Sequence, residues 1–204
     1  MTSTLLSILV GAALLIGSTP VFAQNSDHAA QVAERNAVIR SLAKGHGFTS
    51  DEVAYQFLPE ARVMRVKKKE ATEQVLQRVG ARNTDVLDHR GSLLYIRRAT
   101  PGRTAALAET VGRERLLPVA LNTQNGLLVM LPGSIVVTPK NITQAQQLAS
   151  DHGLTLAGAY PHLNTAFFEV RPGQDVLAAA RALAADARVT RAEPEVIAAL
   201  HEPR

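Results

Sequence analysis

Residues 133–195 have the sequence GSIVVTPKNITQAQQLASDHGLTLAGAYPHLNTAFFEVRPGQDVLAAARALAADARVTRAEPE, in which β-branched runs alternate with stretches of helical periodicity. We expect strands at residues 134–138, 154–160, 165–170 and 188–192, the middle two forming a hairpin. Asn141 or Thr143 can cap one helix, which Gly153 ends, and Asp175 can cap another. The predicted order is β-α-β-β-α-β, which is the order of ferredoxin-like α+β folds.

Residues 61–132 show a similar order with weaker signals. The pattern predicts a strand at 62–66, a helix at 70–79, a hairpin at 85–97, a helix at 104–111 and two apolar runs at 116–121 and 127–131. Val63 and Gly80 fall at the same spacing from Val136 and Gly153, respectively. We therefore expect a divergent internal repeat: a first α+β module at 61–132, of similar connectivity to a ferredoxin-like module at 133–198.

Residues 24–60 are predicted to form a helical segment. Residues 27–44 have the period of an amphipathic helix, with Ala30, Ala33, Ala37, Val38 and Leu42 near one face. The stretch Thr49–Glu52 has the form of a capping box, which predicts a short helix that Pro59 ends.

Residues 1–23 have the features of a secretory signal peptide. The apolar run from Leu5 to Ile16 is too short to span a bilayer, and an A-x-A-like site at residues 21–23 precedes Gln24. The first four residues carry no Lys or Arg, which departs from the usual pattern. We expect cleavage near Ala23 and a periplasmic or secreted protein without a stable membrane anchor; the alternative is an uncleaved anchor.

The composition excludes several kinds of chemistry. The 204 residues include no Cys and no Trp, so the chain has no disulfides and no thiolate ligands or nucleophiles. Aromatic residues make up 4%, too few for a base-stacking surface, and the net charge is only +4. The six histidines are scattered without metal-ligand spacing. We expect no cofactor, no metal, no nucleic-acid partner and no enzymatic activity.

Residues 133–198 resemble the propeptides of subtilisin-like serine proteases, in particular the fervidolysin-type prodomain. The matching segments are Ser134–Thr138, His152–Leu154, Ala166–Val170, Pro172–Gly173 and Val189–Pro194. The resemblance covers about a third of the chain. In that family a catalytic domain follows the prodomain, whereas this sequence ends at Arg204 without Ser-His-Asp machinery.

The resemblance implies a protein that acts in trans, as external chaperones and inhibitors of subtilisin-like or kexin-like serine proteases do. It implies a subtilisin-like serine protease as partner, which the protein would fold, inhibit or both. The alternative is a generic exported α+β binding or scaffold protein that shares only the fold, because fold alone does not determine function.

The binding residues follow from the fold and the resemblance together. Two helices on one sheet face leave the other face bare, and alternation along 165–170 places Phe167 and Glu169 on that bare face. The resemblance implies that this face covers surface helices of the protease; the alternative is that Phe167 packs under the first module. We expect Glu193 and Glu195 to contact helix N-termini of the partner, or else to be a solvated pair beside Pro194.

The last residues are predicted to be inhibitory. In the propeptide family, the residues after the last strand run through the active site of the protease. We therefore expect an extended tail at 199–204, beginning near Val196, with Pro203 limiting its conformations and Arg204 entering an acidic specificity pocket. Such a pocket indicates a kexin-like partner. The alternative is a frayed terminus without function.

Overall fold

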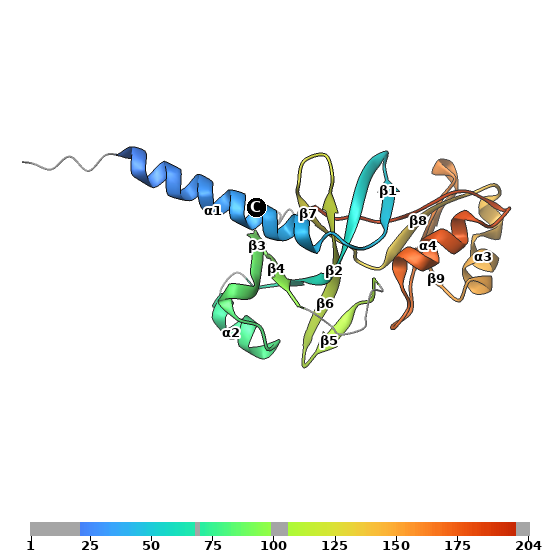
Figure 1. Ribbon diagram of the computed structural model, residues 1–204. Coiled ribbons are helices and arrows are strands. Elements are labelled where there is room, and N and C mark those ends of the chain that lie inside the picture. Colours follow the sequence, from blue (N-terminus) through green and yellow to red (C-terminus); the bar gives the residue numbers. More distant parts are fainter. Residues whose placement is uncertain (1–20, 68–69, 99–105, 199–204) are drawn as a thin grey trace, which may run out of the picture. The chain divides into compact units, whose positions relative to one another are not determined.

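The structure is a computed structural model, and it describes residues 21–67, 70–98 and 106–198 (Figure 1). Residues Arg35–Arg204 form one compact unit and Met1–Glu34 another, and helix α1 (Val21–Leu42) passes from one to the other. The expected helix at 27–44 is confirmed, but of its predicted apolar face only Leu42 is buried. Ile39 and Leu42 are buried in the core, whereas Ala37 and Val38 are exposed. The larger aliphatic side chains bury more apolar area than alanine does, and they determine which face packs.

The predicted short helix at 49–58 is wrong, because this segment is a β-hairpin. Strand β1 (Gly47–Ser50) pairs with the first part of β2 (Val53–Arg65), and Phe48 stacks on its cross-strand partner Tyr55 with ring centroids 5.4 Å apart. The two turn residues, Asp51 and Glu52, have φ of 47° and 64°, as in the type I′ turns that suit two-residue hairpins. The capping-box pattern was a turn signal and not a helix start.

Pro59 does not end an element but lies in a bulge of β2. The ladder between β2 and β6 (Glu114–Asn122) shifts register between Leu58 and Arg62, so the missing N–H of Pro59 costs no ladder bond. The fully buried guanidinium of Arg62 donates hydrogen bonds to the carbonyls of Pro59 (2.9 Å) and Ala61 (2.8 Å). It therefore supplies hydrogen-bond partners to two carbonyls beside the bulge.

The first sheet has seven antiparallel strands in the order β3-β4-β2-β6-β5, with β1 also on β2 and β7 on β6. Its other strands are β3 (Val86–Arg90), β4 (Leu93–Arg97), β5 (Glu109–Val111) and β7 (Leu128–Met130). Helix α2 (Thr72–Arg78) precedes a 3₁₀ turn at Asn83–Asp85. The helix expected at 70–79, the hairpin at 85–97 and the strands at 116–121 and 127–131 are confirmed.

The helix predicted at 104–111 is wrong over its described part. Residues 104 and 105 lie outside the described ranges, and Glu109–Val111 form β5, which pairs with Glu114–Leu116 around Gly112 at φ 60°. The described part of the first module therefore differs in connectivity from the second, and it does not support an internal repeat. Strand β2 also runs across the boundary predicted between residues 60 and 61.

The second sheet has the order β11-β8-β10-β9, and all its neighbours are antiparallel. Its strands are β8 (Ser134–Pro139), β9 (Thr155–Tyr160), β10 (Thr165–Glu169) and β11 (Val189–Pro194), with 3₁₀ turns at Ile142–Gln144 and Pro161–Leu163 and helices α3 (Ala145–Asp151) and α4 (Val176–Ala184) between them. The predicted β-α-β-β-α-β order and α+β class are confirmed.

The capping prediction for Asp175 is confirmed, whereas Asn141 caps the 3₁₀ turn that precedes α3 and not α3 itself. The carboxylate of Asp175 accepts from the N–H groups of Leu177 (2.8 Å) and Ala178 (3.1 Å) at the start of α4. The side chain of Asn141 accepts from the N–H of Thr143 (3.0 Å) at the 3₁₀ turn that leads into α3.

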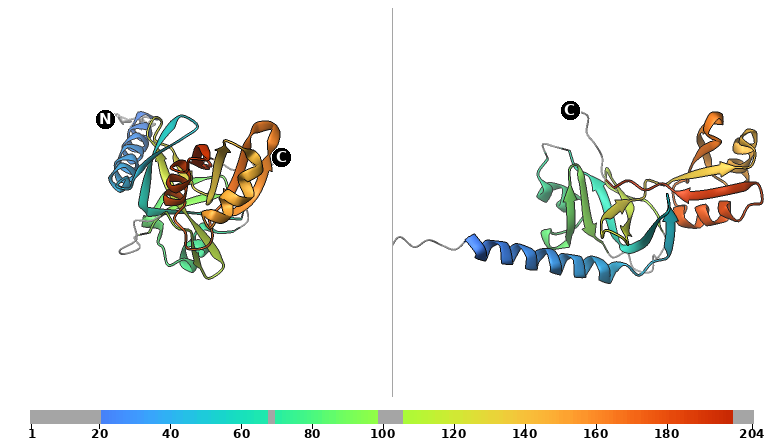
Figure 2. Two further views of the ribbon diagram at one scale, coloured as in Figure 1. Left: turned by 90° about the vertical axis from the view of Figure 1, so that its right-hand side faces the viewer. Right: turned by 90° about the horizontal axis from the view of Figure 1, so that it is seen from above.

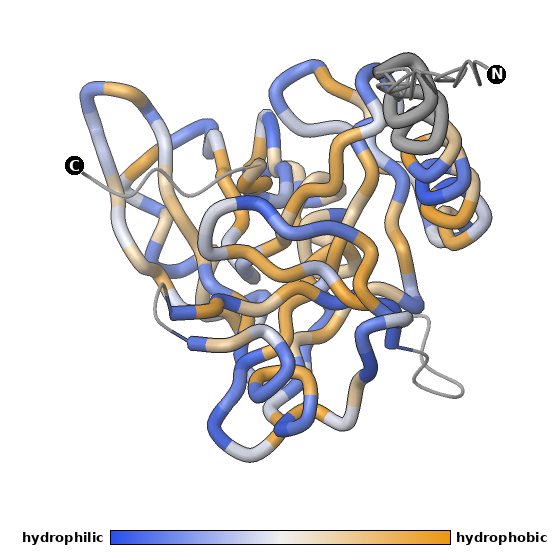
Figure 3. The backbone as a smooth tube through the Cα atoms, turned by 90° about the vertical axis from the view of Figure 1, so that its left-hand side faces the viewer, coloured by the Kyte–Doolittle hydropathy of each residue, from blue (hydrophilic) through white to orange (hydrophobic). Residues whose placement is uncertain are grey.

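One apolar core joins the two sheets. Phe57 and Leu131 of the first region belong to the same cluster as Ile135, Phe168 and Val176 of the second. Two further clusters, around Val63 and around Met64, lie against the seven-stranded sheet. Hydrophobic residues concentrate along the inner strands in Figure 3, and hydrophilic ones along the loops. Residues 35–204 are therefore one packed unit and not two independent modules.

Candidate functional site

The second sheet buries one face and leaves the other accessible. On β10, Ala166 and Phe168 are fully buried with residues of α3 and α4, whereas Thr165 and Phe167 are half-buried and Glu169 is exposed. On β8, Ile135 and Val137 are buried, and Val136 and Thr138 are half-buried. The alternation predicted for β10 thus assigns Ala166 and Phe168 to the covered face correctly. We call the opposite face, with Val136, Thr138, Thr165, Phe167, Arg191 and Glu193, the open face.

Phe167 lies at the middle of a row across the open face. It pairs with Val136 of β8 on one side and with Gly158 of β9 on the other, and Val136 pairs in turn with Glu193 of β11. The ring of Tyr160 meets the ring of Phe167 edge-on, with centroids 5.7 Å apart at 84°. A side chain at position 158 would meet the Tyr160 ring at 3.3 Å, so glycine leaves room for this aromatic pair.

The β1–β2 turn forms one wall of a hollow of about 450 Å³ on this face. Oγ of Ser50 donates to the carbonyl of Pro194 (2.9 Å), and the N–H of Asp51 donates to Oε2 of Glu193 (2.9 Å). Arg191 contacts both Glu193 (2.6 Å) and Asp51 (3.2 Å). Figure 2 shows the cyan hairpin beside the red strand β11.

The charges of this wall are largely paired with one another. The guanidinium of Arg191 lowers the pKa of Glu193, and the N–H of Asp51 adds to this effect. Conversely, the same carboxylate raises the pKa of Arg191. Glu193 is therefore an ionised acceptor that holds the β1–β2 turn against β11.

The structure brings together only some of the predicted site residues. Phe167, Glu193 and Glu195 line the same hollow, and Phe167 is neither fully exposed nor packed away under the first region. Glu193 is engaged within the chain, while the side chain of Glu195 has no hydrogen-bond partner among the described residues. Glu169 lines a different hollow, beside Thr110 and Arg115. Pro203 and Arg204 lie outside the described residues.

The segment after β11 does not leave the fold at Val196, as the predicted tail would. The N–H of Ile197 donates to the carbonyl of Met130 (3.0 Å), and the N–H of Met130 donates to the carbonyl of Ile197 (2.9 Å). Ile197 also packs against the core cluster around Val63. Glu195 is thus bonded to Ser134 of β8 and Ile197 to Met130 of β7, so the chain remains in contact with both sheets as far as Ile197.

Sequence reasoning missed three residues at this site, which are Ser50, Asp51 and Tyr160. Ser50 and Asp51 were not predicted as site residues, because their segment was predicted to be helical. Tyr160 and Leu163, at the β9–β10 connection, are 45% and 63% exposed, which is unusual for large apolar side chains. Tyr160, directly before the predicted turn at residues 161–164, was the available signal.

Within residues 21–67, 70–98 and 106–198, no cluster of three or more His, Asp or Glu side chains is arranged to hold a metal ion. In the same ranges, no helix has the length and apolarity needed to cross a bilayer.

Comparison with known proteins gives two findings. Residues 108–203 match the family model of the open reading frame 2 N-terminal domain. A chain in the crystal structure of the complex of Aeromonas sobria serine protease with the chaperone ORF2 is similar, with 22% identity, a TM-score of 0.36, and coverage of 48% of this chain and 99% of that chain. No curated protein matches this chain.

Proposed function

We propose that this protein is an exported chaperone of a subtilisin-like serine protease and that it also inhibits the protease it assists. The propeptide-like sequence of residues 133–198 supports the proposal, and so does the family match over residues 108–203. The observation that carries it is the open face of the β11-β8-β10-β9 sheet, with Phe167 at its centre. In the family that the sequence resembles, this face covers surface helices of the protease.

The open face has the physical features of a protein-docking surface. Phe167 can act as an aromatic anchor because Tyr160 fixes its ring while part of its surface stays accessible. The hollow beside it accepts a protruding side chain, and the β1–β2 turn that walls it is held by hydrogen bonds before any partner arrives. A preformed surface loses less conformational entropy on binding, and this favours affinity.

The proposal can be tested by refolding a protease in trans. A subtilisin-like serine protease from the same organism, denatured in guanidinium and diluted into buffer, should recover more activity with this chain than without it. Excess chain should then inhibit the folded enzyme. An equal yield of active protease with and without the chain, together with no inhibition, would contradict the proposal.

Two variants test whether the open face is the surface that binds the protease. Phe167→Ala should reduce both the refolding yield and the inhibition. Val38→Ala is the matched control, because it truncates a partly exposed apolar side chain on α1. If both variants act like the wild-type chain, docking does not use this face, whatever the chain does to the protease.

A further inference from the structure

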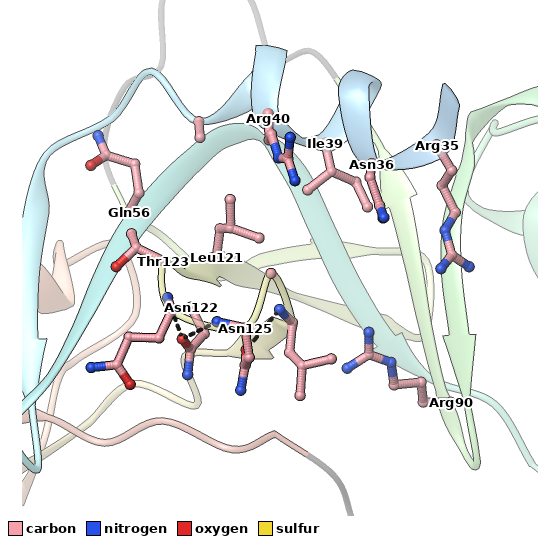
Figure 4. A pocket seen from close by; sticks show the side chains of 14 residues that line it. Arg35, Asn36, Ile39, Arg40, Gln56, Arg90, Leu121, Asn122, Thr123 and Asn125 are labelled. Atoms are coloured by element: carbon pink, nitrogen blue, oxygen red, sulfur yellow. Dashed lines mark hydrogen bonds between the residues drawn. The ribbon is translucent and has the colours of Figure 1, made fainter. Parts of the chain in front are cut away.

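A second hollow, of about 720 Å³, lies at the opposite end of the β1–β2 hairpin from its turn (Figure 4). Its walls are the last two turns of α1, the end of β3 and the loop that joins β6 to β7. In Figure 4 the side chains of Arg35, Asn36, Ile39 and Arg40 project from the helix toward Arg90 and the loop. A volume of this size is within the range of ligand-binding sites.

The lining of this hollow carries positive charge that is not balanced. It includes Arg35, Arg40 and Arg90 and no Asp or Glu. Asp88, behind the lining, contacts both Arg35 (3.2 Å) and Arg90 (2.6 Å), and its side chain is only 9% exposed. One carboxylate thus pairs with two guanidiniums. Arg40 is exposed and has no ion pair among the described residues, so the hollow retains an excess of positive charge.

The loop adds hydrogen-bond donors to this charge. Oδ1 of Asn122 accepts from the N–H groups of Gln124 (2.9 Å) and Asn125 (3.2 Å), and Oδ1 of Asn125 accepts from the N–H of Leu127 (3.0 Å). Because both side-chain oxygens are occupied, the amide nitrogens are the groups that remain for a ligand. Gly126, at φ 73°, allows the tight loop that holds these side chains in place.

Apolar side chains lie between the polar ones. Ile39 and Leu121 are buried and form the floor, and Leu127 is 38% exposed at the edge. A small inorganic anion would leave this apolar surface uncovered. An extended peptide that carries carboxylates on either side of an aliphatic residue would satisfy the guanidiniums, the amide donors and the floor together.

From this arrangement we propose that the hollow binds an acidic peptide segment of a partner protein. Arg40 supplies a guanidinium that has no ion pair among the described residues. Asp88 holds the guanidiniums of Arg35 and Arg90 in position before the peptide binds. The aliphatic residue of the peptide covers Ile39 and Leu127. The site goes beyond the proposed function, since it uses neither the open face nor the propeptide-like module.

Fluorescence anisotropy with the full chain tests the site directly. The probe is a fluorescein-labelled pentapeptide of alternating Glu and Leu, and the matched control probe has Gln in place of Glu. The acidic peptide should bind in 50 mM salt, bind more weakly in 500 mM salt, and bind more tightly than the Gln peptide. Arg40→Gln should weaken binding by about fivefold, the effect of losing an ion pair worth about 1 kcal/mol.

Arg115→Gln is the control variant. Like Arg40→Gln, it removes one positive charge from an exposed position. Arg115 is on β6, the strand that contains Asn122, and lies about 20 Å from Asn122 along that strand. Its affinity for the acidic peptide should equal that of the wild-type chain. Equal binding of the Glu and Gln peptides, or equal affinities of the Arg40 and Arg115 variants, would overturn the proposal.

Competition distinguishes a peptide site from a site for small anions. Unlabelled acidic peptide should displace the probe at concentrations at which inorganic phosphate and citrate do not. Displacement by phosphate or citrate at equal concentration would overturn the peptide as occupant. None of these measurements involves a protease, so failure of the refolding test leaves their outcome unaffected.

Discussion

The main-chain N–H of Asp51 donates a 2.9 Å hydrogen bond to Oε2 of Glu193, across 142 positions of sequence. This bond ties the turn of the first hairpin to the last strand of the second sheet. Arg191 reinforces it by contacting both carboxylates. The shape of the open face therefore depends on the N-terminal part of the unit as well as on residues 133–198.

Glu193→Gln should lower the stability of the chain. Glutamine keeps an acceptor oxygen but loses the charge that Arg191 pairs with, and we expect a loss of about 1 kcal/mol in the free energy of unfolding. The sequence alone predicted partner contacts for Glu193 and therefore no effect on stability. Urea denaturation measures the difference. Glu195→Gln is the control and should change stability by less than about 0.5 kcal/mol, because its side chain has no hydrogen-bond partner in the described part of the chain.

Gly45→Ala should destabilise the chain strongly. A Cβ at position 45 would lie 2.6 Å from Cδ1 and 2.7 Å from the carbonyl oxygen of Phe57, and the backbone of Phe57 cannot move without disturbing β2. We expect a loss of about 2–3 kcal/mol from this overpacking. Gly47→Ala is the matched control, since its Cβ would meet only ordinary contacts at 3.6 and 3.7 Å. Similar thermal midpoints for the two variants would contradict the packing argument.

Asp186 should make stability depend on pH in the acid range. Hydrogen bonds from Arg188 and then from His152 lower the pKa of Asp186 well below its ordinary value. A carboxyl whose folded pKa is lowered contributes stability at pH values above its unfolded pKa of about 3.9, and this contribution is lost as the pH falls toward the folded pKa. Urea midpoints at pH 7, 4 and 2.5 should therefore fall mainly below pH 4.

Substitution identifies the carboxyl responsible. Asp186→Asn should be less stable than the wild-type chain at pH 7 and should lose less stability between pH 4 and 2.5. Glu73→Gln, an exposed position on α2, should retain the full acid dependence. If Asp186→Asn keeps the wild-type acid profile, the dependence arises elsewhere.

Alanine substitutions of the adjacent residues Phe167 and Phe168 should differ in how much they lower the stability of the chain. Phe168 is fully buried in the core beneath α3 and α4, so Phe168→Ala should cost about 3–5 kcal/mol. Phe167 is half-buried on the open face, and Phe167→Ala should cost only about 1 kcal/mol. Thermal unfolding of both variants is the measurement. A loss for Phe167→Ala as large as that for Phe168→Ala would show that its ring acts in the core and not as a docking anchor.

The sequence predicted best the elements whose local signals agree with their tertiary contacts. In the second sheet, the caps at Asn141 and Asp175 and the turn at Gly153 mark the boundaries that packing also enforces. The first region could not be predicted in the same way. Thr49–Glu52 has a local helix signal, but Tyr55 and Phe57 pair with Asn122 and Ala120 far along the chain. Pairing over such separations leaves no local pattern to detect.

For the same reason, the residues around the two hollows could be predicted from the sequence only in part. Phe167 could be placed on the open face because strand alternation is a local property. The wall at Ser50 and Asp51, and the placement of Arg40 and Arg90 around one hollow, depend on how distant segments pack. Each of these residues has ordinary local surroundings in the sequence, and only the fold brings them together.

Residues 201–204 should be the inhibitory element if the proposed function holds. The hydrogen bonds between Ile197 and Met130 hold the segment just before the predicted tail against β7. Arg204 entering an acidic specificity pocket would form a charge-assisted pair, and losing about 1.4 kcal/mol of binding free energy raises an inhibition constant tenfold. Arg204→Ala and deletion of residues 201–204 should therefore each raise the inhibition constant of a kexin-like protease by about tenfold or more. Thermal unfolding should be unchanged if these residues form the predicted tail beyond the core strands. Ile197→Ala is the informative comparison, since it should weaken inhibition and lower stability together. A truncated chain that inhibits as strongly as the full one would leave the open face as the sole basis of any inhibition.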